Sequence, residues 1–202
     1  MKENITVPKL VIIGDSAYDT NRFIGEDGSH FFKTNYGGAG TYSSVPASLF
    51  YRVGLVSNAG EDFNVDKLKK FNIDLRGFHT RKDEKTSRFY NILKTRDGQE
   101  REIAAEYNER LTATFDDIPK EFLKAKYFYI STMLPKNQKQ IIEKLRNHNP
   151  NVIIGVDTFE EYANSDETRE VFDLADIAFV DKEFSNLIHS KSKPKVINLG
   201  KT

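Results

Sequence analysis

The chain has 202 residues, and its 30 lysines and arginines balance its 30 aspartates and glutamates, so the formal net charge is zero. This balance argues against nucleic acid or an anionic membrane as a partner, and no apolar run approaches the roughly 20 residues that a membrane-spanning helix needs. Cysteine is absent, which excludes disulfides and thiolate metal sites, and we expect a cytoplasmic protein.

Six short apolar runs, mostly β-branched or aromatic, follow one another along the chain. They occupy residues 10–13, 53–56, 127–130, 152–156, 177–180 and 196–199. Each run is continuous rather than alternating, and each is too short for a stable helix. Runs of this kind are typical of strands that are buried on both faces of a parallel sheet.

Segments with helical character separate these runs. The predicted helices cover residues 41–51, 136–147, 167–174 and 183–188. In the second of them, Ile141, Ile142 and Leu145 fall on one face. Because strands and helices alternate, right-handed crossovers are expected, and the sequence predicts an α/β fold with a doubly wound, mostly parallel, Rossmann-like sheet.

Two segments, at about residues 19–36 and 77–108, break this alternation. The second contains a stretch, 86–93, in which polar and apolar residues partly alternate, followed by the hairpin-turn sequence Arg96-Asp97-Gly98. We predict that both segments form a small antiparallel β lid over the carboxyl ends of the main strands. No linker or repeat separates them from the rest, so a single α/β domain over residues 1–202 is expected.

The first predicted strand runs into a turn that carries two carboxylates, Asp15 and Asp19. Ligands of open α/β sheets bind beyond the carboxyl ends of the strands, and a carboxylate there can accept hydrogen bonds from two adjacent sugar hydroxyls. Asp62 and Asp157 follow two other predicted strands in the same way. The alternative for each is an ordinary turn or helix-cap residue.

A glycine-rich stretch at residues 35–44 opens the first predicted helix and contains Gly37, Gly38 and Gly40. Glycines at a helix N-terminus let unpaired backbone N–H groups approach a ligand. The stretch is not a Walker A loop, because no Gly-Lys-Ser/Thr follows, and it does not directly follow the first strand as a dinucleotide fingerprint would. A plain tight turn before a helix is the alternative.

Taken together and in this order, these segments resemble the ribokinase-like, or PfkB, carbohydrate kinase family. The resemblance rests on Asp19 after a strand, on the Gly37-Gly38 pair that opens a helix, and on Gly60-Glu-Asp62 after the next strand. The stretches 72–74, 85–93, 175–181 and 195–200 are similar to later segments of the family pattern. The resemblance is colinear over nearly the whole chain, and it implies a ribokinase-like fold.

The resemblance also implies a reaction, in which a hydroxyl group of a sugar or nucleoside attacks the γ-phosphate of ATP while Mg²⁺ and backbone amides neutralise the developing charge. The residues that it implies for the acceptor are Asp19, Gly37 and Gly38, with Tyr42, Phe89 and Asn91 as a wall. Those that it implies for the nucleotide are Asp157, Asp181 and Gly200, with Glu183 for the metal ion.

Three departures from the family pattern change what is expected. Asp181-Lys-Glu-Phe184 stands where the family has Asn-Glu-x-x-Glu, so the second glutamate falls on Phe184 unless Glu183 replaces it. Ala39 replaces the lysine of ribokinase's Gly-Gly-Lys-Gly, so ribose is not favoured over other acceptors. The family's Gly-Ala-Gly-Asp segment, whose aspartate is the general base, is absent up to Thr202. We therefore assign no catalytic residue and expect the base beyond Thr202.

The sequence leaves two other functions to be weighed. A non-catalytic sugar- or nucleoside-binding protein derived from such a kinase would keep the acceptor pocket and the lid. A nucleotide-binding oxidoreductase is disfavoured by the missing fingerprint after the first strand. The strand edges of the lid also lead us to expect a homodimer formed through the lid.

Overall fold

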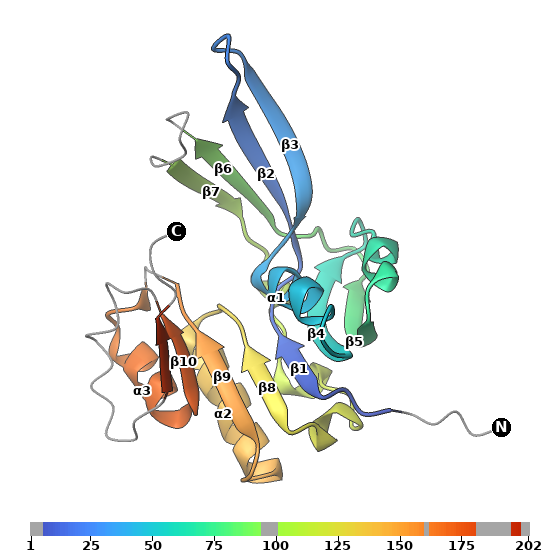
Figure 1. Cartoon of the computed structure of the whole chain (residues 1–202), viewed down its shortest axis with the longest axis vertical. Coiled ribbons are helices and arrows are strands. Elements are labelled where there is room, and N and C mark those ends of the chain that lie inside the picture. The colour runs from blue at the N-terminus through green and yellow to red at the C-terminus, as the bar shows by residue number, and fades with distance from the viewer. Residues whose placement is uncertain (1–5, 94–100, 160–161, 181–194, 199–202) are drawn as a thin grey trace, which may run out of the picture.

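The computed structural model describes residues 6–93, 101–159, 162–180 and 195–198. Its strands form two sheets, a large one and a smaller one that projects from it (Figure 1). The predicted helix at 183–188, the hairpin turn at 96–98 and the site candidates Asp181, Glu183 and Gly200 lie outside the described residues. Within the described part of the chain, no helix is long and apolar enough to cross a membrane.

The large sheet contains seven parallel strands within the described residues. They are β1 (Leu10–Ile13), β4 (Val53–Gly60), β5 (Ile73–Arg81), β8 (Tyr127–Ile130), β9 (Ile153–Asp157), β10 (Ile177–Val180) and β11 (Lys195–Asn198), in the spatial order β11-β10-β9-β8-β1-β4-β5. Each of the six predicted runs contributes residues to a strand of this sheet, which confirms the doubly wound, parallel architecture. The chain leaves β1 toward β4 and later returns to β8 on the other side. The carboxyl end of β1 therefore lies at the switch point of the sheet, where such sheets bind ligands.

The prediction for residues 77–81 was wrong, because they belong to β5 of the large sheet and not to the lid. β5 pairs in parallel with β4, for instance at Ser57 and Phe78, and it lies at the edge of the sheet. Its side chains are partly exposed along much of its length, as expected for an edge strand. Without a continuous apolar run, the segment lacks the pattern by which the other parallel strands were recognised.

Helices cover both faces of the large sheet. On one face, α1 (Ala39–Ala47) packs Val45 and Ala47 against the apolar cluster around Ile12. On the other face, α2 (Pro135–His148) and α3 (Asp166–Leu174) bury apolar side chains in the same cluster as Ile13. Short 3₁₀ helices connect the remaining elements: η1 (Val65–Lys70), η2 (Glu109–Leu111), η3 (Phe115–Asp117) and η4 (Phe122–Lys124). The helix predicted at 41–51 ends early, at Ala47, where Pro46 removes a hydrogen-bond donor from the last turn.

The smaller sheet is the predicted lid. It consists of β2 (Ala17–Ile24), β3 (His30–Gly37), β6 (Arg88–Leu93) and β7 (Arg101–Glu106), in the order β3-β2-β6-β7. The hairpins β2–β3 and β6–β7 are antiparallel, as predicted, but a parallel pairing of β2 with β6 joins them, so the sheet is mixed. The lid projects beyond the carboxyl ends of the strands of the large sheet (Figure 1).

Asp62, the acid of the Gly-x-Asp motif, fastens the lid to the large sheet. Its carboxylate accepts hydrogen bonds from the Thr86 backbone N–H (2.8 Å), the Thr86 hydroxyl (2.7 Å) and the Arg88 guanidinium (2.9 Å), where β6 begins. Burial alone would raise the pKa of Asp62, but these hydrogen bonds hold it below its ordinary value. Of the two roles considered for this residue, the structure supports the structural one.

Candidate functional site

The carboxyl end of β1 and the N-terminus of α1 meet in a close backbone contact. The Gly40 N–H donates a hydrogen bond to the Asp15 carbonyl oxygen (2.9 Å). A Cβ at Gly38, where φ is +83°, would lie 2.5 Å from the same oxygen, and a Cβ at Gly14 would overlap Ser131 Oγ. The glycines therefore allow the start of α1 to lie directly on the strand end.

Asp19 is buried beside this turn, and only one of its two carboxylate oxygens has a hydrogen-bond partner among the described residues. It is 8 % exposed, and its Oδ2 accepts a hydrogen bond from the Tyr42 hydroxyl (2.8 Å) on α1. Its Oδ1 is buried and has no hydrogen-bond partner among the described residues. A Cβ at Gly37 would overlap this carboxylate. The fold thus brings together four of the predicted acceptor residues: Asp19, Gly37, Gly38 and Tyr42.

The environment shifts the pKa values of the two partners in this hydrogen bond. Burial raises the pKa of the Asp19 carboxyl, and the hydrogen bond from Tyr42 offsets part of that rise. Burial and the nearby Asp19 raise the pKa of Tyr42 to about 12. Tyr42 therefore stays a neutral donor at physiological pH, and Asp19 keeps one carboxylate oxygen for a further donor.

The lid supplies an aromatic wall next to Asp19. Phe89 on β6 is the register partner of Asp19 on β2, so the two side chains share one face of the lid. The Phe89 ring contacts that of Tyr107, with centroids 6.4 Å apart. Asn91 pairs with Asn21, two residues farther along both strands on the same face. Phe89 is therefore adjacent to the Asp19 cluster, and Asn91 lies farther out.

A second carboxylate, absent from the predicted site residues, lies on the other side of the turn. Asp15 Oδ2 accepts a hydrogen bond from the Tyr107 hydroxyl (3.3 Å), which also bonds to the Thr112 hydroxyl (2.9 Å). Asp15 Oδ1 is buried and has no partner among the described residues. The position of Asp15 directly after a predicted strand could have identified it as a site residue from the sequence. Tyr107 gave no signal, because only the path of the chain after β7 brings it to β1.

Asp157 ends β9, two strands away from β1 and therefore about 10 Å from it at ordinary strand spacing. Its Oδ1 is buried and has no partner among the described residues. Burial raises its pKa, and hydrogen bonds from Tyr129 and Thr132 offset part of that rise. The Gln138 side-chain amide holds its backbone carbonyl (2.7 Å). Asp157 lies on the same sheet edge as Asp19 but outside the Asp19 cluster.

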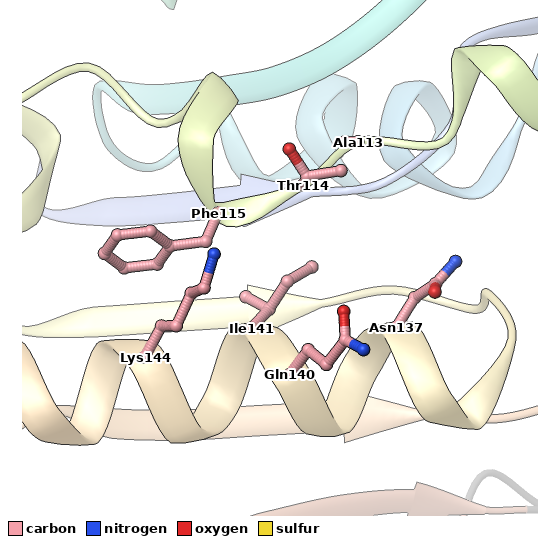
Figure 2. A pocket seen from close by; sticks show the side chains of 7 residues that line it. All are labelled: Ala113, Thr114, Phe115, Asn137, Gln140, Ile141 and Lys144. Atoms are coloured by element: carbon pink, nitrogen blue, oxygen red, sulfur yellow. The ribbon is translucent and has the colours of Figure 1, made fainter.

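The described residues contain no group of three or more His, Asp or Glu side chains that could hold a metal ion. A hollow of about 40 Å³ lies between α2 and residues 113–115 (Figure 2). Its lining residues are Ala113, Thr114, Phe115, Asn137, Gln140, Ile141 and Lys144. The hollow is far below the several hundred Å³ of typical small-molecule sites, so it is not a candidate for a sugar or nucleoside.

Solved structures show which proteins share this fold. A sugar kinase from Pyrococcus horikoshii is 19% identical (TM-score 0.66), and the match covers 89% of this chain and 64% of that one. A Burkholderia thailandensis nucleoside kinase, solved with inosine, is 14% identical (TM-score 0.69, 91% and 64% covered). A Xylella fastidiosa fructokinase is 16% identical (TM-score 0.66, 91% and 66% covered). The chain thus spans just under two thirds of the length of these structures.

Sequence comparisons give the family. A search of curated protein sequences found no significant match. The sequence profile described as "pfkB family carbohydrate kinase", in contrast, matches residues 7–202. This match covers almost the whole chain, and the fold is that of ribokinase-like sugar and nucleoside kinases. The chain therefore belongs to the pfkB family of carbohydrate kinases.

Proposed function

We propose that these residues carry the acceptor-binding part of an enzyme that phosphorylates a hydroxyl group of a sugar or nucleoside with ATP. The observation that carries the proposal is the buried Oδ1 of Asp19, which has no hydrogen-bond partner among the described residues. A buried carboxylate oxygen without a partner is costly, and a ligand hydroxyl would supply the missing hydrogen bond. The absence of a side chain at Gly37 lets the turn lie against the Asp19 carboxylate, and Phe89, on the same lid face as Asp19, offers an apolar surface to the carbon face of a sugar ring.

Membership of the family implies ATP as the phosphoryl donor. Asp157 fits a place on the phosphate side of the site, because it lies on the same sheet edge and its buried Oδ1 has no partner among the described residues. Mg²⁺ in kinases is held by one or two carboxylates together with substrate phosphates and water, so a single carboxylate suffices on the protein side. We assign Asp157 to the hydrated Mg²⁺–ATP complex. Asp181, Glu183 and Gly200 stay predictions for the same role.

The Asp19→Asn substitution tests the acceptor site. Replacing the carboxylate with an amide removes a charged acceptor and places an N–H₂ group in its position. Hydrogen bonds to charged groups contribute about 1.5–3 kcal/mol each, so we expect the loss of one such bond to weaken acceptor binding roughly 10- to 150-fold. Titration calorimetry with a panel of neutral sugars and nucleosides measures this, and thermal unfolding checks that the variant folds.

The matched control is Asp66→Asn, because the Asp66 side chain is 74% exposed and pairs with Lys69 at the surface. It should leave acceptor binding unchanged. Unaltered affinity in a folded Asp19→Asn variant would refute the assignment of Asp19 to the acceptor.

A binding protein without catalysis is the second candidate, and Phe184 at the position of the family's second glutamate favours it. Incubation with Mg²⁺–ATP and each acceptor that binds separates the two candidates. A phosphorylated acceptor identifies a kinase, whereas acceptor binding with neither ATP binding nor product identifies the binding protein.

We also propose a homodimer formed through the lid. Phe31 and Ile103 lie on the same lid face as Asp19, and they are 52% and 54% exposed. Exposed apolar side chains favour association, and light scattering should give twice the 23.2 kDa of one chain. Phe31→Asp should yield the monomer, whereas Phe50→Asp, at a residue that is 78% exposed and outside the lid, should not. Dissociation by the Phe50 change alone would place the contact elsewhere.

A further inference from the structure

We propose that Asp15 and Tyr107 form the second half of the acceptor site, and that the resulting pair of carboxylates selects neutral or positively charged acceptors over anionic ones. The inference rests on the proposed function, because it deepens the description of the same site. It concerns specificity, and it names the class of substrate: a neutral polyhydroxylated sugar, an amino sugar or a nucleoside, rather than a sugar acid or a sugar phosphate.

Two carboxylates flank one glycine turn. The Asp19 carboxylate fills the position that a Cβ at Gly37 would take, and the backbone of Asp15 fills the position that a Cβ at Gly38 would take. Asp15 and Asp19 are four residues apart, so their Cα atoms are separated by at most about 14 Å. In the proposal, one sugar or nucleoside with several hydroxyl groups reaches both carboxylates.

Asp15 and Asp19 leave hydrogen-bond acceptors available for a ligand. Asp15 and Asp19 each have one carboxylate oxygen bonded to a tyrosine hydroxyl and one buried oxygen without a partner among the described residues. The two tyrosines, Tyr42 and Tyr107, direct their hydroxyl hydrogens toward the carboxylates and are therefore not free to donate to a ligand. The open groups are acceptors, so a ligand has to bring hydrogen-bond donors. Hydroxyl and ammonium groups are donors, whereas carboxylate and phosphate groups are not.

The negative charge of the two carboxylates also bears on which acceptor binds. The bond from Tyr107 to Asp15 is 3.3 Å long, which is long for a hydroxyl–carboxylate pair, so it neutralises little of the negative charge. Burial raises the pKa of Asp15 to about 6, so the group is still mainly ionised at neutral pH while poorly solvated. On the same lid face, Lys33 is an exposed cation two residues beyond Asn35, the register partner of Asp19. A negatively charged acceptor beside the turn would thus meet two carboxylates at short range, and the cation lies farther out.

The rings of Phe89 and Tyr107 form an aromatic wall beside the two carboxylates. Phe89 and Tyr107 form one continuous ring surface that runs from the Asp19 side to the Asp15 side of the site. The C–H face of a sugar or the flat face of a base packs well on such a surface. Tyr107 therefore has two roles in the proposal: it orients Asp15 through its hydroxyl, and it contacts the acceptor through its ring.

The test compares matched neutral and anionic probes. The pairs are fructose and fructose 6-phosphate, glucitol and gluconate, and inosine and inosine monophosphate, each titrated into the 202-residue chain and its variants by calorimetry. We expect the neutral member of at least one pair to bind about 100-fold more tightly than its anionic partner. Asp15→Asn should weaken binding of that neutral probe about tenfold or more. The ratio of the affinities for the neutral and the anionic probe of the pair should fall by a similar factor.

Tyr107→Phe keeps the ring and removes only the hydroxyl, so it should weaken neutral binding by a smaller factor of about three to ten. Thermal unfolding of each variant checks that it is folded. If Asp15→Asn leaves the ratio of neutral to anionic affinity unchanged while Asp19→Asn loses acceptor binding, the role of Asp15 is overturned. The proposed function is then unaffected. Tighter binding of the anionic probes by the unaltered chain also overturns it. Failure of every neutral probe to bind overturns the proposed function and this inference together.

Discussion

Replacing Gly38 with alanine is expected to lower the free energy of unfolding by roughly 3–4 kcal/mol. The residue has φ +83° and ψ 143°, a region that is essentially restricted to glycine and costs other residues about 1–3 kcal/mol. The new Cβ would also lie 2.5 Å from the Asp15 carbonyl oxygen, and such overpacking costs roughly 1–3 kcal/mol more. Urea unfolding monitored by circular dichroism measures the loss.

Gly28 provides the matched control, because it has almost the same φ, +79°, but a Cβ there would meet nothing within 4 Å. Gly28→Ala therefore carries only the conformational penalty, roughly 1–2 kcal/mol. The difference between the two variants isolates the steric contact between the glycine turn and the end of β1. If Gly28→Ala and Gly38→Ala lower the free energy of unfolding equally, the glycine turn can move away from β1. The close contact would then not hold the site in place.

The large sheet was predictable because burial on both faces leaves a direct trace in the sequence. The run at 10–13, for example, is apolar at every position, and the structure buries it between helices on both sides. β5 was missed for the opposite reason. An edge strand is partly exposed, so residues such as Arg76 and His79 interrupt its apolar positions, and the pattern no longer differs from that of a lid strand.

The predicted residues that form the site are close in sequence, apart from Phe89, which was reached through the family resemblance. Asp19 lies on β2 and Gly37 ends β3, the neighbouring strand of the same hairpin, while Gly38 follows as the N-cap residue of α1, and the family pattern pointed to all three. The contact of Tyr107 with Asp15 joins residues 92 positions apart. It depends on the parallel pairing of β2 with β6, and parallel register has no short turn to reveal it in the sequence.

The Asp15→Asn substitution should stabilise the ligand-free chain at pH 7.5 by about 1–3 kcal/mol. In the unfolded chain Asp15 titrates near its ordinary pKa of 3.8, whereas burial raises the pKa in the folded chain to about 6. The folded state therefore holds the proton more tightly than the unfolded state. Its contribution to stability is complete below about pH 3.8 and is lost as the pH rises from about 4 to about 6.

An asparagine does not ionise, so the variant escapes this loss. We expect its stability relative to the unaltered chain to increase between pH 4 and pH 6.5 and then to stay constant. Other carboxyl groups, including Asp19 and Asp62, contribute their own pH dependence, but it is common to both proteins and cancels in the difference. Chemical unfolding of both proteins at a series of pH values measures that difference.

A constant difference between pH 4 and pH 7.5 would mean that water or a neighbouring group already satisfies the Asp15 carboxylate. The predicted pH dependence has a functional counterpart, because a group that destabilises the empty site when ionised is one that gains most from a ligand donor. A bound neutral acceptor should accordingly stabilise the unaltered chain more at pH 7.5 than it stabilises Asp15→Asn. The excess should disappear near pH 4, where both proteins carry an uncharged group at position 15.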